Sequence, residues 1–144
     1  MGASMTQRPD LFGAIFCGYP LLDMARYQKF LVGRWWTTEY GSAENPKQAD
    51  YILKYSPYQN VKVSAKYPAV MFWTGSRDTR VDPLHARKMT ALLQATSTSG
   101  RPVLLHYSLA GGHSSGVSVE QDIQDDTDEL TFLWTETGQP PSRK

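Results

Sequence analysis

The sequence predicts an α/β fold, in which a mostly parallel sheet of about three strands is flanked by helices. Three short apolar segments, residues 11–19, 69–75 and 103–109, have the length and the bounding prolines or glycines of buried strands. A segment with helical character follows each of them, and crossovers of this kind make consecutive strands parallel. A chain of 144 residues has room for one ordinary domain, so these elements should share one sheet.

The first strand is expected over residues 11–19. This run is apolar and lies between Pro9 and Pro20, which predicts a strand buried on both faces, as in a parallel sheet. Asp23 is placed to cap a following helix over about 24–32, where apolar residues recur at helical spacing.

Residues 33–68 are expected to be irregular. Their aromatic side chains include Trp35, Trp36, Tyr40, Tyr51, Tyr55 and Tyr58. In one interpretation these rings pack beneath long loops. In the other they form an aromatic pocket for a substrate, and the pattern alone leaves both open.

A second strand is expected over 69–75 and a third over 103–109. Between them, Asp82 is placed as the N-cap of a helix and Pro83 as its first residue, because a first-turn proline leaves no N–H unpaired. This helix should stop near Gly100.

The last helix is expected over about 117–135. Its apolar residues predict a face buried against the sheet, made of Val119, Ile123, Leu130, Leu133 and Trp134. Its acidic residues should form a solvated face, and the early ones also suit a helix N-terminus. We therefore expect one folded unit over residues 1–135 and a flexible tail over 136–144.

Composition excludes several classes of function. The 15 Lys and Arg residues nearly balance the 14 Asp and Glu residues, so no surface for nucleic acid is expected. The single cysteine, Cys17, permits no internal disulfide or cysteine zinc site and should be a small buried side chain. No apolar run is long enough to span a membrane, and residues 1–6 lack the pattern of a signal peptide. These features predict a soluble, cytoplasmic protein.

No metal or cofactor is expected. The histidines, His85, His106 and His113, do not form the spaced pair of a zinc enzyme. The glycine-rich residues 111–116 do not fit a dinucleotide fingerprint, because no acidic residue follows about 20 residues later at the end of a further strand.

Two loops at strand ends could carry chemistry. Asp78 follows the second predicted strand and His113 follows the third, and the carboxyl ends of parallel strands meet at one edge of a sheet. An acid followed by a histidine is the second half of the Ser–Asp–His order of α/β-hydrolases, in which the acid orients an imidazole that moves a serine proton. On pattern alone, an aspartate of this kind is often only a helix cap and a histidine in a glycine loop is often only exposed, so the structural interpretation stays open.

The nucleophile of such a site is missing. The α/β-hydrolases place it in Gly-x-Ser-x-Gly between a strand and a helix. Ser4 near the start lacks that frame. Ser114 has it, in Gly112–Gly116, but it directly follows His113, the candidate base, and neither Ser114 nor Ser115 is expected to be the nucleophile.

Six motifs together resemble one family of enzymes. In chain order they are Gln7–Gly13, Pro20–Met24, Trp36–Gly41, Tyr55–Val61, Asp78–Ala86 and Gly111–His113. Over residues 1–135 the set is similar to the C-terminal part of the catalytic domain of the prolyl oligopeptidase family of serine peptidases, and within it to a bacterial prolyl endopeptidase-like branch. The resemblance implies the C-terminal half of an α/β-hydrolase three-layer sandwich.

The resemblance also implies roles for individual residues. Asp78 matches the acid of the catalytic triad and His113 its histidine. Arg80 matches an arginine that binds a substrate carbonyl, which suits a planar donor group. Trp36 matches the aromatic residue that stacks on a substrate proline, although Trp35 leaves a purely structural alternative open. Other pocket positions are matched by Tyr40, Leu21 and Val81.

The resemblance places the catalytic serine upstream of Met1, so the isolated chain is expected to be inactive. With the serine supplied, the implied function is hydrolysis of peptide bonds by acyl transfer. An esterase or an acylaminoacyl peptidase would use the same acid and histidine. The expected partners are a peptide substrate and the missing N-terminal half of the domain.

A non-catalytic alternative is a fragment that self-associates. The strand at 11–19 would be interior in a complete domain, so its edge would lack a neighbour and favour pairing with a second copy.

Overall fold

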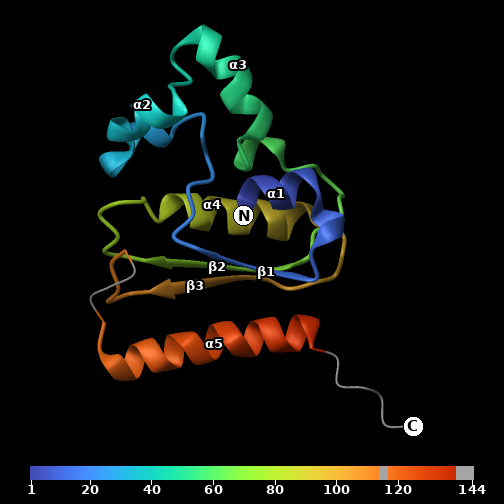
Figure 1. The fold of residues 1–144 in the computed structure, drawn as a ribbon. Coiled ribbons are helices and arrows are strands. Elements are labelled where there is room, and N and C mark those ends of the chain that lie inside the picture. Colours follow the sequence, from blue (N-terminus) through green and yellow to red (C-terminus); the bar gives the residue numbers. More distant parts are fainter. Residues whose placement is uncertain (114–116, 139–144) are drawn as a thin grey trace.

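The computed structural model describes residues 1–113 and 117–138, which form a three-layer α/β arrangement with helices on both sides of a sheet (Figure 1). The expected tail over 136–144 lies mostly outside the described residues. Within them, no helix is long and apolar enough to cross a membrane.

The central layer is a parallel sheet of β1 (Ala14–Gly18), β2 (Ala69–Gly75) and β3 (Val103–Ser108), in the order β1-β2-β3. β2 is buried along its whole length, as a strand with neighbours on both sides should be. The predicted parallel α/β sheet is therefore confirmed, and β2 has the predicted bounds.

The first strand is shorter and less buried than predicted. Pro9–Leu11 forms a 3-10 turn, and β1 alternates between buried and partly exposed residues before Gly18, which is exposed. The expectation of a strand buried on both faces is wrong because only Ile15 and Cys17 are buried in the main core. Ala14 and Phe16 point to the other face, where they pack against the small cluster around Phe132 and stay partly exposed. Cys17 is buried, as expected, and burial raises the pKa of its thiol.

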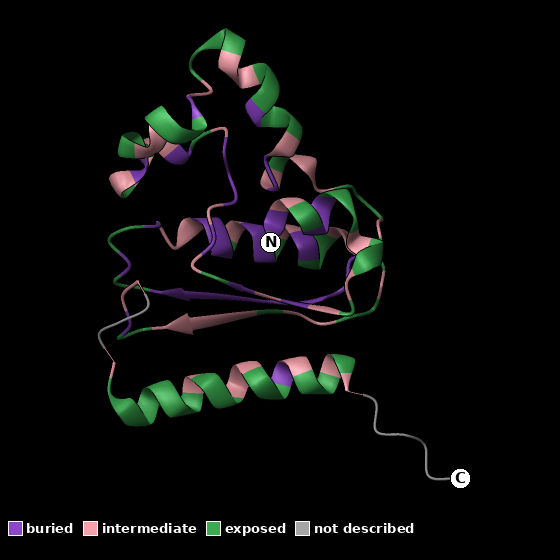
Figure 2. Ribbon diagram, in the orientation of Figure 1, coloured by how far each residue is buried: buried purple, intermediate pink, exposed green. Residues whose placement is uncertain are grey.

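One face of the sheet is covered by α1 (Gly2–Gln7) and α4 (Leu84–Thr96). The main core lies here (Figure 2) and consists of Met5, Ile15, Cys17, Leu22, Tyr67, Val70, Phe72, Ala86, Met89 and Leu93. The start of α4 differs slightly from the prediction, because the helix begins at Leu84 with Pro83 before it. Asp82 still satisfies the helix start by accepting the Leu84 N–H at 2.9 Å.

The other face is covered by α5 (Val119–Thr137), whose orientation overturns the prediction. The predicted buried residues Val119, Ile123, Leu130 and Trp134 are all exposed, and we call them the outer stripe of α5. The side chain that α5 buries is Phe132, which packs with the β2 residues Met71 and Trp73 and with partly buried Leu133. The predicted stripe is a real face of the helix, but it points away from the sheet.

Polar contacts also attach α5 to the sheet. Arg101, just before β3, donates hydrogen bonds to the carbonyl oxygens of Gly13 and Glu136 and forms an ion pair with the Glu136 carboxylate at 3.1 Å. The ring of His106 stacks on Trp73 and lies 3.6 Å from the carboxylate of Asp125. The acidic side of α5 thus faces the sheet in part, and not solvent alone.

The segment between β1 and β2 contains a helical insertion, residues 20–60. Its elements are η2 (Tyr27–Lys29), η3 (Leu31–Trp36), α2 (Thr37–Tyr40), α3 (Pro46–Tyr55) and η4 (Tyr58–Asn60). The predicted helix over 24–32 is therefore wrong, and so is the prediction that 33–68 is irregular. The chain turns at Leu31, where φ is +47°, and a side chain at Gly33 would place its Cβ 2.1 Å from the Tyr27 carbonyl oxygen.

The helical insertion has a small core of its own. Its buried side chains are Met24, Tyr27 and Ile52, with Leu21, Trp36 and Tyr55 packed against them. Figure 1 shows α2 and α3 projecting beyond α4, on the side of that helix away from the sheet. Trp35 is 67% exposed and so is not a core residue.

Candidate active site

The loops that follow β2 and β3 are joined by backbone hydrogen bonds. The Ser76 N–H donates to the Ser108 carbonyl at 2.8 Å, and the Arg77 N–H donates to the Gly111 carbonyl at 3.0 Å. Gly75 permits this approach, since a Cβ there would lie 2.2 Å from the Gly111 oxygen. The two loops that carry the predicted acid and histidine are therefore held side by side.

Asp78 and His113 are in direct contact. The Nδ1 atom of His113 lies 2.8 Å from Oδ2 of Asp78, whose side chain is fully buried. The other carboxylate oxygen, Oδ1, accepts the backbone N–H groups of Arg80 and Val81, each at 2.8 Å. Both oxygens thus have donors, which fixes the plane of the carboxylate and aims it at the imidazole.

This contact determines what the imidazole can do. An ionised carboxylate only accepts, so its partner Nδ1 carries the proton and Nε2 has the free lone pair. The side chain of His113 is 31% exposed, so it can be reached from outside. The arrangement can remove a proton from a group placed at Nε2 and stabilise the imidazolium that forms.

Tyr19 is a site residue that the sequence did not reveal. It follows β1 at the same edge of the sheet, and its ring centroid lies 4.9 Å from that of His113. Its φ of +45° is unusual for a non-glycine residue, and the following Pro20 disfavours helical backbone at this position. No motif marks Tyr19, since neither its conformation nor its contact can be read from residue type.

Arg80 and Trp36 come from different segments and lie against each other. The guanidinium carbon of Arg80 lies 5.8 Å from the centroid of the Trp36 ring, so the β2 loop touches the helical insertion here. Val81, next to Arg80, is buried and donates its N–H to Asp78.

Leu21 and Tyr40 line the same cavity, which has a volume of about 190 Å³ and is also lined by the start of α1. Its other lining residues are Met1, Gly2, Ala3, Met24, Tyr55 and Pro57. The Tyr40 ring stands edge-on to Tyr27, whose hydroxyl donates to the Gly41 carbonyl. Burial raises the pKa of Tyr27 to about 12, so this hydroxyl stays a neutral donor.

The predicted residues therefore form three groups. Asp78 pairs with His113 and accepts the Val81 N–H, Arg80 lies against Trp36, and Leu21 shares a cavity with Tyr40. Ser114 and Ser115 lie outside the described residues. Within the part of the chain that the structure describes, no group of three His, Cys, Asp or Glu side chains is arranged to hold a metal ion.

Comparison with known proteins places this site in context. Residues 1–140 match the model of the prolyl oligopeptidase family, Peptidase_S9. The prolyl endopeptidase of Elizabethkingia miricola is 42% identical over 139 residues, which cover 96% of this chain and 20% of that protein. A solved post-proline cleaving enzyme from Rickettsia typhi is 36% identical, with a TM-score of 0.88, over 94% of this chain and 19% of that one.

A third similar structure is prolyl oligopeptidase B from Galerina marginata. It is 28% identical with a TM-score of 0.88, over 95% of this chain and 20% of that one. It has been solved with bound substrate peptides after a histidine, a serine or an aspartate was changed to alanine. The present chain spans about a fifth of the length of these relatives.

Proposed function

Since this chain belongs to the prolyl oligopeptidase family of serine peptidases, we propose that it supplies the aspartate and the histidine of a Ser–Asp–His site that cleaves peptide bonds. The observation that carries the proposal is the contact between Asp78 and His113 at the carboxyl ends of β2 and β3. The Galerina marginata structures support it, because the same three residue types were replaced there in complexes with substrate.

In the proposed mechanism His113 acts twice. Its Nε2 removes the proton of a serine hydroxyl as the oxygen attacks the substrate carbonyl carbon. The resulting imidazolium, held at Nδ1 by Asp78, then gives this proton to the leaving amine, so that the peptide C–N bond breaks and an acyl-enzyme remains. Water deacylates the serine by the same route in reverse.

The pocket residues are proposed to select the substrate. The flat ring of Trp36 suits the apolar face of a proline ring, and the fork of Arg80 suits a backbone carbonyl of the peptide. Leu21 and Tyr40, which line the cavity beside Met24, and Val81 would complete an apolar site for the residue on the acyl side of the scissile bond.

The Gly-x-Ser-x-Gly frame occurs in this sequence at Gly112–Gly116, but it includes the proposed base His113, and its serine directly follows that residue. The proposed nucleophile is therefore a serine outside this sequence, where the family resemblance places it. We therefore propose that the chain has no peptidase activity by itself. Its partner in catalysis would be the N-terminal half of the same domain, which completes the sheet beside β1.

A chimera tests the proposal. The matching 139 residues of the Elizabethkingia miricola prolyl endopeptidase would be replaced by this chain, so that the relative provides the serine and everything upstream. We expect the chimera to cleave a proline-containing fluorogenic peptide. An inactive chimera whose circular dichroism and melting temperature match those of the parent enzyme would contradict the proposal.

Three substitutions assign the roles within the chimera. His113→Ala should lower kcat by about 10⁶-fold because the general base is lost. Asp78→Asn should lower it by about 10⁴-fold, because the imidazole loses its oriented tautomer. Trp36→Ala should mainly raise KM for proline substrates. Matched ester and acylaminoacyl substrates would show whether an esterase or an acylaminoacyl peptidase describes the activity better.

Self-association is a second candidate, favoured by two surfaces. Within the described residues β1 pairs only with β2, and the outer stripe of α5 is exposed. An open strand edge and an apolar helix face both favour a second copy. Sedimentation velocity across a concentration series tests this, since a monomer at every concentration would rule it out.

A further inference from the structure

Three consecutive residues join the helical insertion to the rest of the molecule. Leu22 enters the main core beneath α4, whereas Met24 enters the separate core of the helical insertion. Asp23 lies between them and is only 1% exposed. A buried carboxylate therefore occupies the junction between the two cores.

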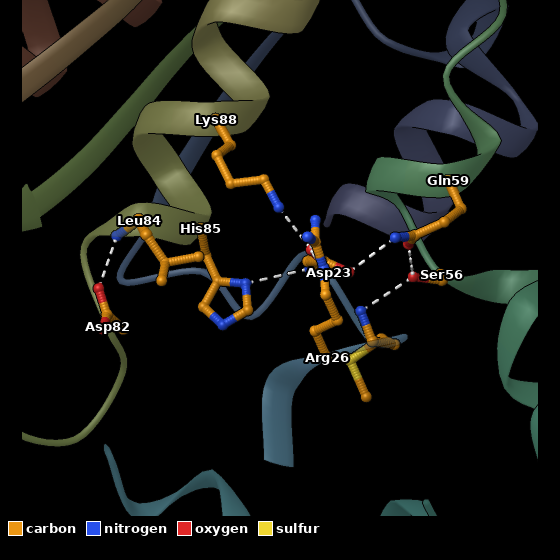
Figure 3. Close-up of polar contacts among 9 residues, drawn as sticks. Asp23, Arg26, Ser56, Gln59, Asp82, Leu84, His85 and Lys88 are labelled. Carbon is orange, nitrogen blue, oxygen red and sulfur yellow. Dashed lines mark hydrogen bonds and ion pairs between the residues drawn. The ribbon is translucent and has the colours of Figure 1, made fainter. Parts of the chain in front are cut away.

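Cations from both sides of the junction meet this carboxylate (Figure 3). Lys88 of α4 donates to Oδ2 of Asp23 at 2.5 Å, and Arg26 of the helical insertion lies 2.7 Å from the same oxygen. Burial raises the pKa of Asp23, but hydrogen bonds from Lys88, Gln59 and Arg26 outweigh it, so the pKa is lowered overall. The carboxylate is thus ionised and links α4 to the helical insertion.

A second link runs from α4 to the backbone of Asp23. The Asp23 N–H donates to Nδ1 of His85 at 3.1 Å, which requires a neutral imidazole with its proton on Nε2. His85 is buried, and its Nε2 has no hydrogen-bond partner within the described residues. Burial lowers the pKa of His85 to about 4, so this acceptor is maintained at neutral pH.

A third link ties the end of the helical insertion to its beginning. The Gln59 side chain donates to Oδ1 of Asp23 at 2.6 Å, and the Ser56 hydroxyl donates to the Gln59 side-chain oxygen. Ser56 in turn accepts the Met24 N–H at 2.9 Å. Figure 3 shows Gln59 reaching Asp23 from the end of the helical insertion, while Lys88 and His85 reach it from α4.

The position of this junction matters for the pocket. Leu21, Trp36 and Tyr40 belong to the helical insertion, whereas Arg80 precedes α4 in the β2 loop. The two groups meet where Arg80 lies over Trp36. Any rotation of the helical insertion about the Asp23 junction would change the distance between its pocket residues and Arg80.

We propose that Asp23 is a positioning residue for substrate selection, which holds the helical insertion against α4 and so sets the size of the pocket formed with the β2 loop. This inference rests on the function proposed above. Asp23 touches no substrate in this scheme and acts through Leu21, Trp36 and Tyr40. Removing its charge should alter which substrates are cleaved, beyond any change in the amount of active enzyme.

The first test uses the chain alone and hydrogen–deuterium exchange. Asp23→Asn should raise amide exchange about tenfold or more in residues 21–40, while β2 and β3 keep their protection. Asp10→Asn is the matched control, because Asp10 pairs with Arg8 at an exposed site. Unchanged exchange in residues 21–40, or a uniform rise across the whole chain, would overturn the proposal.

The second test uses the chimera and pairs of peptides that differ only in proline or alanine on the acyl side of the scissile bond. Asp23→Asn should lower the ratio of the two kcat/KM values about tenfold, chiefly through KM for the proline peptide. A purely structural role would reduce the active fraction and leave this ratio unchanged, which would refute the proposal.

Lys88 provides variants that leave Asp23 in place. Lys88→Met should shift the specificity ratio in the same direction by a smaller factor, and Lys88→Arg should retain it because the charge is kept. If Asp23→Asn fails to fold, the comparison of Lys88→Met with Lys88→Arg decides whether the contact with Asp23 controls substrate selection. An inactive parent chimera would count against the peptidase function alone, because the exchange experiment still decides whether Asp23 holds the helical insertion.

Discussion

The two helices that cover the sheet use their apolar residues in opposite ways. α4 turns its buried side chains, including Met89 and Leu93, onto the sheet and shares the main core with β1 and β2. α5 buries Phe132 and exposes its outer stripe. Helical spacing therefore predicts which residues share a face, but not whether that face meets the sheet.

The difference also separates two ways of holding a helix. α4 is held by apolar contact, whose strength grows with the area removed from water. α5 is held by a small cluster around Phe132 and by polar contacts from Arg101 and His106. We expect the two layers to respond very differently to the same kind of substitution.

The largest effect should come from truncating the α4 layer. Met89 is fully buried, so Met89→Ala should lower the free energy of unfolding by about 2–5 kcal/mol through lost transfer energy and a residual cavity. Urea denaturation followed by circular dichroism measures this. A loss below about 1 kcal/mol would mean that the core beneath α4 collapses around the gap.

The second largest effect should come from acidification, which should lower the free energy of unfolding through His85 of α4. His85 has a pKa of about 4 in the folded chain, against an ordinary value of 6.5, so the unfolded chain binds this proton more readily. The stabilising contribution is fully present above about pH 6.5 and is lost as the pH falls towards 4, with a maximum of about 3 kcal/mol.

His85→Gln serves as the control for this pH dependence. The variant cannot titrate in that window, so its unfolding free energy should fall less between pH 6.5 and 4. Identical pH profiles for the two proteins would show that other groups carry the dependence.

In the α5 layer, Phe132→Ala should cost about 2 kcal/mol, less than an equivalent change in a large core, because few buried side chains surround Phe132. The effect should be local. Hydrogen exchange should rise throughout α5 while α4 keeps its protection, and an equal rise in both helices would contradict separate layers.

The smallest effect should come from the outer stripe. Leu130→Gln and Ile123→Gln should change the free energy of unfolding by less than about 0.5 kcal/mol, because both side chains are already exposed. If the outer stripe mediates self-association, the same variants should sediment as smaller species. A loss of several kcal/mol would mean that the outer stripe packs against something within the chain.

The elements that could be predicted are those that follow from local pattern. β2, β3 and α4 could be predicted from the sequence because the apolar runs of the strands and the Asp82-Pro83 start of the helix are local signals. The predicted helix over 24–32 failed for a non-local reason. The Asp23 side chain, expected to cap this helix, instead accepts hydrogen bonds from Lys88 and Gln59. Both partners are distant in sequence, so no local pattern indicates these contacts.

The candidate site divides in the same way. The proximity of Asp78 and His113 follows from their positions after two neighbouring parallel strands. Trp36 and Leu21 came only from family resemblance, because an aromatic or apolar residue in a loop indicates packing and binding equally well. Neither the sequence pattern nor the family resemblance indicated Tyr19, since its left-handed backbone and its ring contact with His113 depend on the folded structure.

The strand register suggests an order of assembly for the site. Pairing Ala14 with Ala69 closes a longer loop than pairing Val70 with Val103, because the whole helical insertion lies between β1 and β2. Closing a longer loop costs more chain entropy, and contacts distant in sequence form more slowly. We therefore expect β2, α4 and β3 to nucleate folding and bring Asp78 and His113 together first, with β1 joining afterwards and carrying the substrate pocket into place.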